Sequence, residues 1–110
     1  MTVQGQIEKA QQYALANAQL TQAQELAIAK NPNLEAAAWG TQYDTLFKTA
    51  VNNDPFLKAQ GIMTTPRGQF GPDVFNPQTQ EWWDLTTPAQ WNAHLQKYWL
   101  FGEGSPLFTK

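Results

Sequence analysis

The chain contains no cysteine, and His94 is its only histidine. The absence of cysteine excludes disulfide scaffolds and thiolate zinc sites. Without cysteine, the sequence does not indicate whether the protein works in an oxidising or a reducing compartment. Charged residues are also sparse: they make up 15% of the chain, and the formal net charge is −2. Broad electrostatic binding to nucleic acid needs a clustered basic face, which this composition argues against. A nuclease that grips phosphate through a metal ion and a few basic side chains is not excluded.

Long apolar runs are absent as well. No segment reaches the length that crosses a membrane, and the N-terminus lacks a basic segment followed by an apolar block. We therefore expect a soluble piece with no membrane partner. It either stays in the cytoplasm or belongs to a larger protein that carries its own export machinery. The length of 110 residues fits one domain, or one small domain with a helical extension.

Residues 4–30 are rich in glutamine and alanine, and most of them are good helix formers. Thr21 with Gln24 matches a capping box, which predicts that a second short helix starts near Gln22. The same composition is typical of a linker or stalk. We therefore predict a helical extension over residues 1–31 and a compact α+β domain over residues 32–110.

A clear amphipathic helix is predicted over residues 34–52, because apolar side chains recur at spacings of three and four from Trp39 onward. Asp44 and Lys48 lie at i,i+4 on this helix, and we expect them to pair in solvent. Glu35 has two interpretations. It is either a first-turn acidic residue favoured by the helix dipole, or a carboxylate aimed at a functional site.

The second half of the chain has the pattern of a hairpin followed by a helix. Two extended runs, over residues 69–75 and 80–86, flank an Asn-Pro turn signal. A Thr-Pro pair then marks a helix start and predicts a helix over residues 88–101. The tail is expected to be extended, with Leu107 and Phe108 docking back. The predicted fold class is α+β: N-terminal helices, then a β-hairpin or small antiparallel meander and a C-terminal helix.

Two acidic residues fall on the predicted hairpin, Asp73 on its first strand and Asp84 on its second. Closure around Pro77-Gln78 places both on one face, as diagonal neighbours about 7–8 Å apart at the backbone. Carboxylates this close repel unless a positive charge lies between them, and Mg²⁺ or another divalent cation is the natural occupant. A one-residue register slip would put Glu81 beside Asp73 instead.

The order of these residues resembles a known nuclease core. Gly71-Pro72-Asp73, a hairpin-sized gap, and an acidic strand followed by a helix are similar to the PD-(D/E)xK nucleases. That core has a helix with an acidic residue, a β-meander and a second helix. The string that ends at Tyr98, GPDVFNPQTQEWWDLTTPAQWNAHLQKY, also resembles C-terminal nuclease toxin domains of bacterial polymorphic and contact-dependent toxins. The resemblance covers about residues 34–100.

The resemblance implies metal-dependent hydrolysis of phosphodiester bonds. Asp73 would be the PD aspartate, Asp84 the second metal ligand and Glu35 the acidic residue of the first helix. Together they would hold Mg²⁺ or another divalent cation. The resemblance also implies a nucleic-acid substrate, a cognate immunity protein, and a larger secreted or surface-delivered effector that acts in the cytoplasm of a target cell.

The pattern departs from the family at Thr86, where the family has a lysine that positions water or stabilises negative charge at phosphorus. Lys97, His94 and Arg67 are the candidates to supply the missing positive charge. A lone helical histidine is often a packed side chain with one hydrogen bond, but His94 also suits a general base or a phosphate contact near neutral pH. A metal-independent RNase, with His94 assisted by basic side chains and Tyr98, therefore competes with the metal-dependent interpretation.

Four tryptophans lie close to these residues: Trp82, Trp83, Trp91 and Trp99. They could stack bases, but filling the core of a small domain is the preferred interpretation. Trp82 and Trp83 are adjacent in a strand, so we expect them to face opposite ways. A non-enzymatic phage or secretion-system structural or adaptor module is a further alternative, because it fits the Gln/Ala-rich start and the missing lysine.

Overall fold

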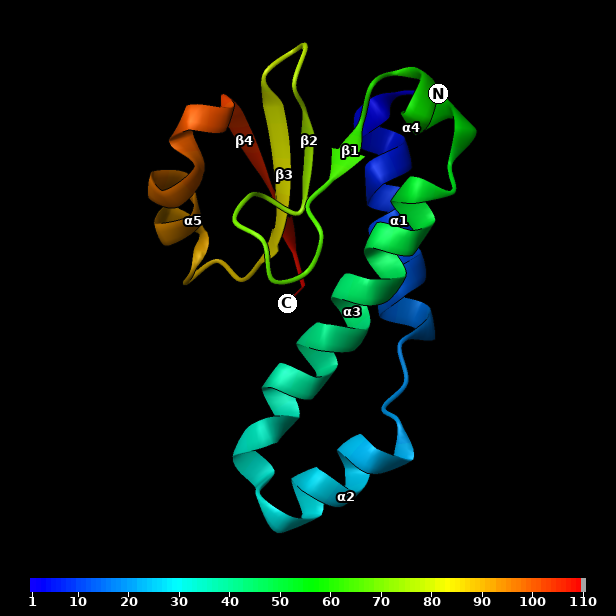
Figure 1. Ribbon diagram of the computed structural model, residues 1–110, viewed down its shortest axis with the longest axis vertical. Helices are drawn as coiled ribbons and strands as arrows, with labels where there is room; N and C mark the ends of the chain where they lie inside the picture. Colours follow the sequence, from blue (N-terminus) through cyan, green and yellow to red (C-terminus); the bar gives the residue numbers. More distant parts are fainter. Residues whose placement is uncertain (110) are drawn as a thin grey trace.

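The computed structural model describes residues 1–109, as helices and a four-stranded sheet (Figure 1). The elements are, in chain order, α1 (Val3–Asn17), α2 (Gln22–Lys30), the 3₁₀ turn η1 (Pro32–Leu34), α3 (Glu35–Asn52), α4 (Pro55–Ala59), β1 (Met63–Thr64), β2 (Val74–Asn76), β3 (Glu81–Thr86), α5 (Trp91–Tyr98), the 3₁₀ turn η2 (Trp99–Phe101) and β4 (Glu103–Phe108). The α+β class is confirmed, but the chain ends in a strand and not in the predicted C-terminal helix. None of the helices within residues 1–109 is long and apolar enough to span a membrane.

The sheet is mixed, with the strand order β1-β2-β3-β4. β1, β2 and β3 form the predicted antiparallel meander. β4 pairs parallel with β3, and α5 lies in the connection between them, since parallel neighbours need a long crossover. The predicted extended tail is therefore a full strand. Leu107 is buried in it as expected, whereas Phe108 is exposed.

Helices cover both faces of the sheet, with α1 and α3 on one side and α5 on the other (Figure 1). Successive strand residues point to opposite faces, so Trp83 joins the core beside α1 and α3 while Trp82 packs against Trp91 and Tyr98 of α5. The predicted opposite facing of Trp82 and Trp83 is confirmed. Both are buried, so they fill the core and are closed to a ligand.

The first helix contributes directly to that core. Ile7, Ala10 and Ala14 of α1 are buried in one cluster with side chains of α3, β2, β3 and β4. Gln11 Nε2 also donates a hydrogen bond to the carbonyl oxygen of Phe108, at 2.8 Å, which joins α1 to the last strand. The division at residue 31 stays a prediction, but α1 shares its core with the strands.

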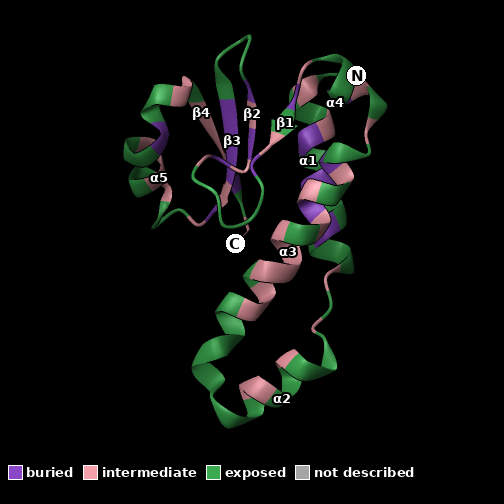
Figure 2. Cartoon of the chain, viewed as in Figure 1, coloured by how far each residue is buried: buried purple, intermediate pink, exposed green. Residues whose placement is uncertain are grey.

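Residues 21–43 form a helical arm that projects from this body (Figure 2). It comprises α2, η1 and the first half of α3, and α2 has no buried residue. The predicted capping box of Thr21 and Gln24 is present at the start of α2. Gln42 Nε2 donates to Gln24 Oε1 at 3.1 Å, so a side-chain contact joins the two helices of the arm.

Two predicted boundaries in the second half are wrong. The last helix begins at Trp91, because residues 88–90 form a turn in which the Gln90 N–H donates to the Thr87 carbonyl at 3.1 Å, and no side chain caps the helix. The first extended run shortens to β2, because residues 66–71 form a loop. Gly68 adopts a φ of 86° in this loop, a conformation that favours glycine and does not continue a strand.

Candidate functional site

The register of the hairpin brings the two predicted aspartates opposite each other. Val74 pairs with Trp83 and Phe75 with Trp82. Asp73 is not in the strand as predicted but in the bend just before β2, where the same register extended by one position puts it opposite Asp84. The predicted diagonal placement is therefore wrong by two positions, because the turn contains four residues, 77–80, and not two. A shift of two preserves the side-chain face, and the Asp73 N–H and the Asp84 carboxylate are in contact.

Reciprocal hydrogen bonds hold the two carboxylates in place. The Asp73 N–H donates to Asp84 Oδ1 at 2.8 Å, and the Leu85 N–H donates to Asp73 Oδ2 at 2.8 Å. Each aspartate thus receives a main-chain donor from the partner strand. The side chains are also withdrawn from solvent, since Asp84 is only 5% exposed and Asp73 19%.

His94 contacts the same pair from α5, which lies on the other side of the sheet from α1 and α3 (Figure 1). Its Nδ1 contacts Asp84 Oδ2, and its ring lies edge-on to Tyr98 at a centroid distance of 6.2 Å. With Nδ1 engaged by a carboxylate, the second ring nitrogen, Nε2, is the one left for chemistry. The imidazole is partly buried, with 26% of the side chain exposed.

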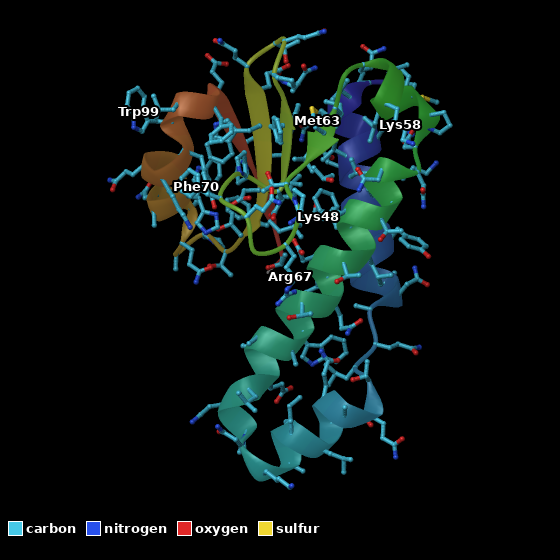
Figure 3. The ribbon with its side chains drawn as sticks, viewed as in Figure 1. Lys48, Lys58, Met63, Arg67, Phe70 and Trp99 are labelled. Atoms are coloured by element: carbon cyan, nitrogen blue, oxygen red, sulfur yellow. The ribbon has the colours of Figure 1, made fainter. Side chains whose placement is uncertain are left out.

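Lys48 is the site residue that the sequence pattern does not reveal. Its Nζ lies 2.9 Å from Asp44 Oδ1, as the i,i+4 spacing predicts, but also 3.4 Å from Asp73 Oδ1. The side chain is only 15% exposed, so the expectation of a pair in open solvent is wrong. Figure 3 places Lys48 between α3 and the sheet. No local spacing signals this contact, because it depends on how α3 packs across the meander.

Burial and mutual repulsion change the protonation of the carboxyl pair. Burial, followed by the charge of Asp84, raises the pKa of Asp73 to about 8. Burial raises the pKa of Asp84 as well. Two carboxyls in contact titrate as one unit, so the pair holds a proton near neutral pH.

Burial and neighbouring charges shift the pKa of His94 in opposite directions. Burial lowers the pKa of His94, which keeps the resting imidazole neutral. The charge of Asp73 opposes this and raises the pKa. The Asp84 carboxylate, in contact with Nδ1, is placed to stabilise an imidazolium once one has formed. A neutral base whose protonated form has a carboxylate partner is suited to accepting a proton during a reaction.

These groups line a cleft of about 1010 Å³ between the helical arm and the sheet. Asp73, Asp84, Thr86 and His94 lie on its body side, and Glu35 lies at its exposed rim in the first turn of α3. A second hollow, of about 730 Å³, adjoins the cleft along α3 and is lined by the 66–71 loop, Lys48 and Asp73. The two hollows share residues, so the carboxyl pair lies where they meet.

The other predicted site residues make contacts with groups outside the carboxyl pair. Thr86 is buried, and its hydroxyl donates to the Thr87 carbonyl at 3.1 Å. Lys97 lies over the rings of Phe70 and Tyr98, with its Nζ 5.7 and 5.3 Å from their centroids. Arg67 lines the second hollow.

Arg67 Nη2 donates to Thr41 Oγ1 of α3 at 2.9 Å. Among the basic residues within positions 1–109, Lys48 is therefore the one whose ammonium pairs with Asp73.

The carboxylate oxygens of Asp73 and Asp84 are not free to bind a divalent cation as they stand. Each of the four carboxylate oxygens of Asp73 and Asp84 already contacts a donor of the chain: Lys48 Nζ, His94 Nδ1 or a main-chain N–H. Within residues 1–109, no group of three or more His, Asp or Glu is arranged to hold a metal ion. The Mg²⁺ site predicted from Asp73, Asp84 and Glu35 stays a prediction.

Comparison with known proteins gives no match: no protein-family model, no curated protein and no solved structure matches this chain. The site is therefore interpreted from its own geometry.

Proposed function

We propose that the protein is a nuclease whose active site is the cleft around Asp73, Asp84 and His94. The observation that carries the proposal is that Asp84 contacts the imidazole of His94 and the backbone of Asp73 at once, beside the ammonium of Lys48. A base, an acid and a cation thus converge where the cleft meets the second hollow. The order α3, meander, α5 also supports the resemblance to PD-(D/E)xK nucleases.

The arrangement supports RNA cleavage by acid–base catalysis. His94 Nε2 takes the proton of a 2′-hydroxyl, the resulting oxygen attacks phosphorus, and the bond from phosphorus to the 5′-oxygen breaks. The 5′-oxygen leaves with the proton held by the carboxyl pair, which yields a cyclic phosphate and a free hydroxyl. Asp84 orients His94 and stabilises the imidazolium.

Lys48 supplies the positive charge that Thr86 lacks. In the resembled family a lysine two residues after the second acidic ligand stabilises negative charge at phosphorus. Here the ammonium comes from α3 and lies 3.4 Å from Asp73 Oδ1. A cation placed there stabilises the charge that develops on a phosphoryl oxygen.

The metal-dependent route is the second candidate. It is favoured by the directly opposed Asp73 and Asp84, a pair of the kind that binds Mg²⁺ together with water and phosphate oxygens. A divalent cation would have to displace the shared proton and the Lys48 ammonium. Glu35, at the rim of the same cleft, would be its third carboxylate.

Cleavage of matched single-stranded RNA and DNA, in EDTA and in Mg²⁺, tests these routes. We expect RNA cleavage that persists in EDTA and falls by about 10²–10⁴-fold in His94→Ala, while DNA resists because it lacks the 2′-hydroxyl. Asn92→Ala, an exposed position on the same helix, is the matched control and retains full activity.

Other outcomes are equally decisive. Cleavage that requires Mg²⁺ and is lost in Asp73→Ala or Asp84→Ala identifies the metal-dependent route. Full activity in both of these variants overturns the assignment of the active site to this cleft. No cleavage of either nucleic acid under either condition overturns the assignment of a nuclease.

We also propose that the nuclease is a bacterial toxin module delivered by a larger secreted effector and neutralised by a cognate immunity protein. The support is the resemblance of the segment from Gly71 to Tyr98. Expression of residues 1–110 without a partner should arrest growth, and His94→Ala should relieve the arrest. Harmless expression would favour the structural or adaptor alternative.

A further inference from the structure

One aromatic pair lies in the cleft and outside the core. Trp39 and Tyr43, one turn apart on α3, have stacked rings with centroids 5.8 Å apart and an interplanar angle of 25°. Both line the cleft that contains Asp73, Asp84 and His94. Both are also only partly buried, and neither belongs to the hydrophobic core cluster. The pair therefore has aromatic surface at the cleft that core packing does not use.

The other tryptophans differ from Trp39 in this respect. Trp82 and Trp83 are buried, and Trp91 packs against Trp82. Trp99 is 68% exposed but does not line the cleft. Within residues 1–109, Trp39 is thus the one tryptophan that lines the cleft beside the carboxyl pair.

The charge of the cleft limits how it binds a polyanion. Across the two adjoining hollows, the acidic residues Glu35, Asp44, Asp73 and Asp84 outnumber the basic residues Lys48 and Arg67. A nucleic-acid duplex is gripped mainly through many cationic contacts to its phosphates. This surface does not offer them, so most of the binding free energy has to come from elsewhere. Stacking of unpaired bases on aromatic rings supplies such binding and tolerates any sequence.

We propose that Trp39 and Tyr43 form a base-stacking subsite, and that the substrate class is single-stranded nucleic acid. The proposal rests on the nuclease function proposed above, because it takes the Asp73–Asp84–His94 cleft as the place of reaction. An unpaired base lies on the aromatic pair while its phosphate reaches the carboxyl pair and Lys48. A duplex keeps its bases stacked internally and leaves the subsite unused.

Binding to the catalytically impaired His94→Ala chain tests the subsite without cleavage. The probe is a short fluorescently labelled single-stranded RNA, followed by anisotropy, with its own duplex as comparison. Adding Trp39→Ala should weaken single-strand binding by about 5- to 150-fold, the range that base–aromatic stacking implies. Trp39→Phe should restore most of the affinity, and duplex binding should be weak and unchanged.

Trp99→Ala is the matched control, because it removes an exposed tryptophan that does not line the cleft. It should bind as tightly as its parent. The subsite is overturned if Trp39→Ala binds like its parent, if Trp99→Ala loses as much affinity, or if the duplex binds as tightly as the single strand. If the unsubstituted chain cleaves RNA while Trp39→Ala binds normally, only the subsite fails. If the unsubstituted chain neither binds nor cleaves nucleic acid, the nuclease function fails with it.

Discussion

At the scale of single residues, the site is organised by Asp84. Its two carboxylate oxygens contact the backbone of Asp73 and the imidazole of His94, so one buried side chain links the meander to α5. Lys48 connects α3, in the third layer, to the site through its ion pair with Asp73. The site therefore draws on all three layers of the molecule, and it exists only when they are packed together.

The raised pKa of Asp73 predicts a pH dependence of stability. Its folded-state pKa is about 8, above the ordinary value of 3.8. Between these values the folded state binds more protons than the unfolded state. The free energy of unfolding therefore falls as pH rises through this window, and the loss is complete above about pH 8. Urea unfolding across the window should show a decrease on the order of 1–3 kcal/mol, allowing for relaxation of the carboxyl pair.

Asp73→Asn isolates the origin of this decrease. The amide cannot ionise, so the variant should gain stability relative to the unsubstituted chain as pH rises. Asp44→Asn is the control, because this helix residue pairs with Lys48 but is not opposed to Asp84. Parallel pH profiles for the unsubstituted chain and Asp73→Asn would contradict the raised pKa.

Part of the site is predictable from the sequence because strands repeat with a period of two. Asp73 and Asp84 share a face under any even shift of register, so the wrong turn length did not separate them. His94 was found through residue type alone. The helix spacing predicts only the bond from Lys48 to Asp44, and so places Lys48 in solvent. Its second bond depends on a packing angle that no local pattern encodes.

At the scale of elements, the sequence predicts that the tail is extended but not that it pairs with β3 as the strand β4. The segment Glu103–Phe108 holds Gly104 and Pro106, residues that are depleted in strands. In the structure Gly104 lies opposite Trp82, and a Cβ built on it would be 2.2 Å from the Trp82 ring. The glycine that weakens the strand pattern is thus the residue that lets β4 approach the tryptophan. The amphipathic helices, by contrast, followed from periodicity.

Gly104→Ala should destabilise the domain by about 1–3 kcal/mol, since the added methyl group overpacks the contact with Trp82. Gly40→Ala is a control of opposite sign. Gly40 is a helical residue with nothing within 4 Å of an added Cβ, so alanine should stabilise α3 by about 0.5–1 kcal/mol. Chemical denaturation of both variants measures the difference. Equal stabilities would contradict the tight packing of β4 on Trp82.

At the scale of the whole molecule, the two ends of the chain are parts of one core. Ile7 of α1 and Leu107 of β4 belong to the same buried cluster. The arm, in contrast, extends away from the body and has mostly exposed residues (Figure 2). Composition alone groups α1 with α2, because both are rich in glutamine and alanine. Packing distinguishes the two helices, because α1 has residues in the core whereas α2 has no buried residue.

Removal of residues 1–31 should therefore abolish cooperative unfolding. The truncation exposes the surface of Phe47, Val51 and Trp83 that α1 covers. Ile7→Ala in the full chain should cost about 2–5 kcal/mol, while Leu26→Ser in α2, where the side chain is 60% exposed, should be nearly neutral. Thermal unfolding followed by circular dichroism gives all three results. A sharp transition for residues 32–110 alone would show that α1 is dispensable.

The hydrogen bond from Gln11 to Phe108 joins positions 97 residues apart. Contacts between such distant positions form late, because the intervening chain must first be closed into a loop. A polypeptide that emerges N-terminus first, from a ribosome or through a translocation pore, carries an incomplete core until its last residues are released. Until β4 can pair with β3 and pack with α1, the cleft that contains Asp73, Asp84 and His94 therefore lacks part of the core on which it is built.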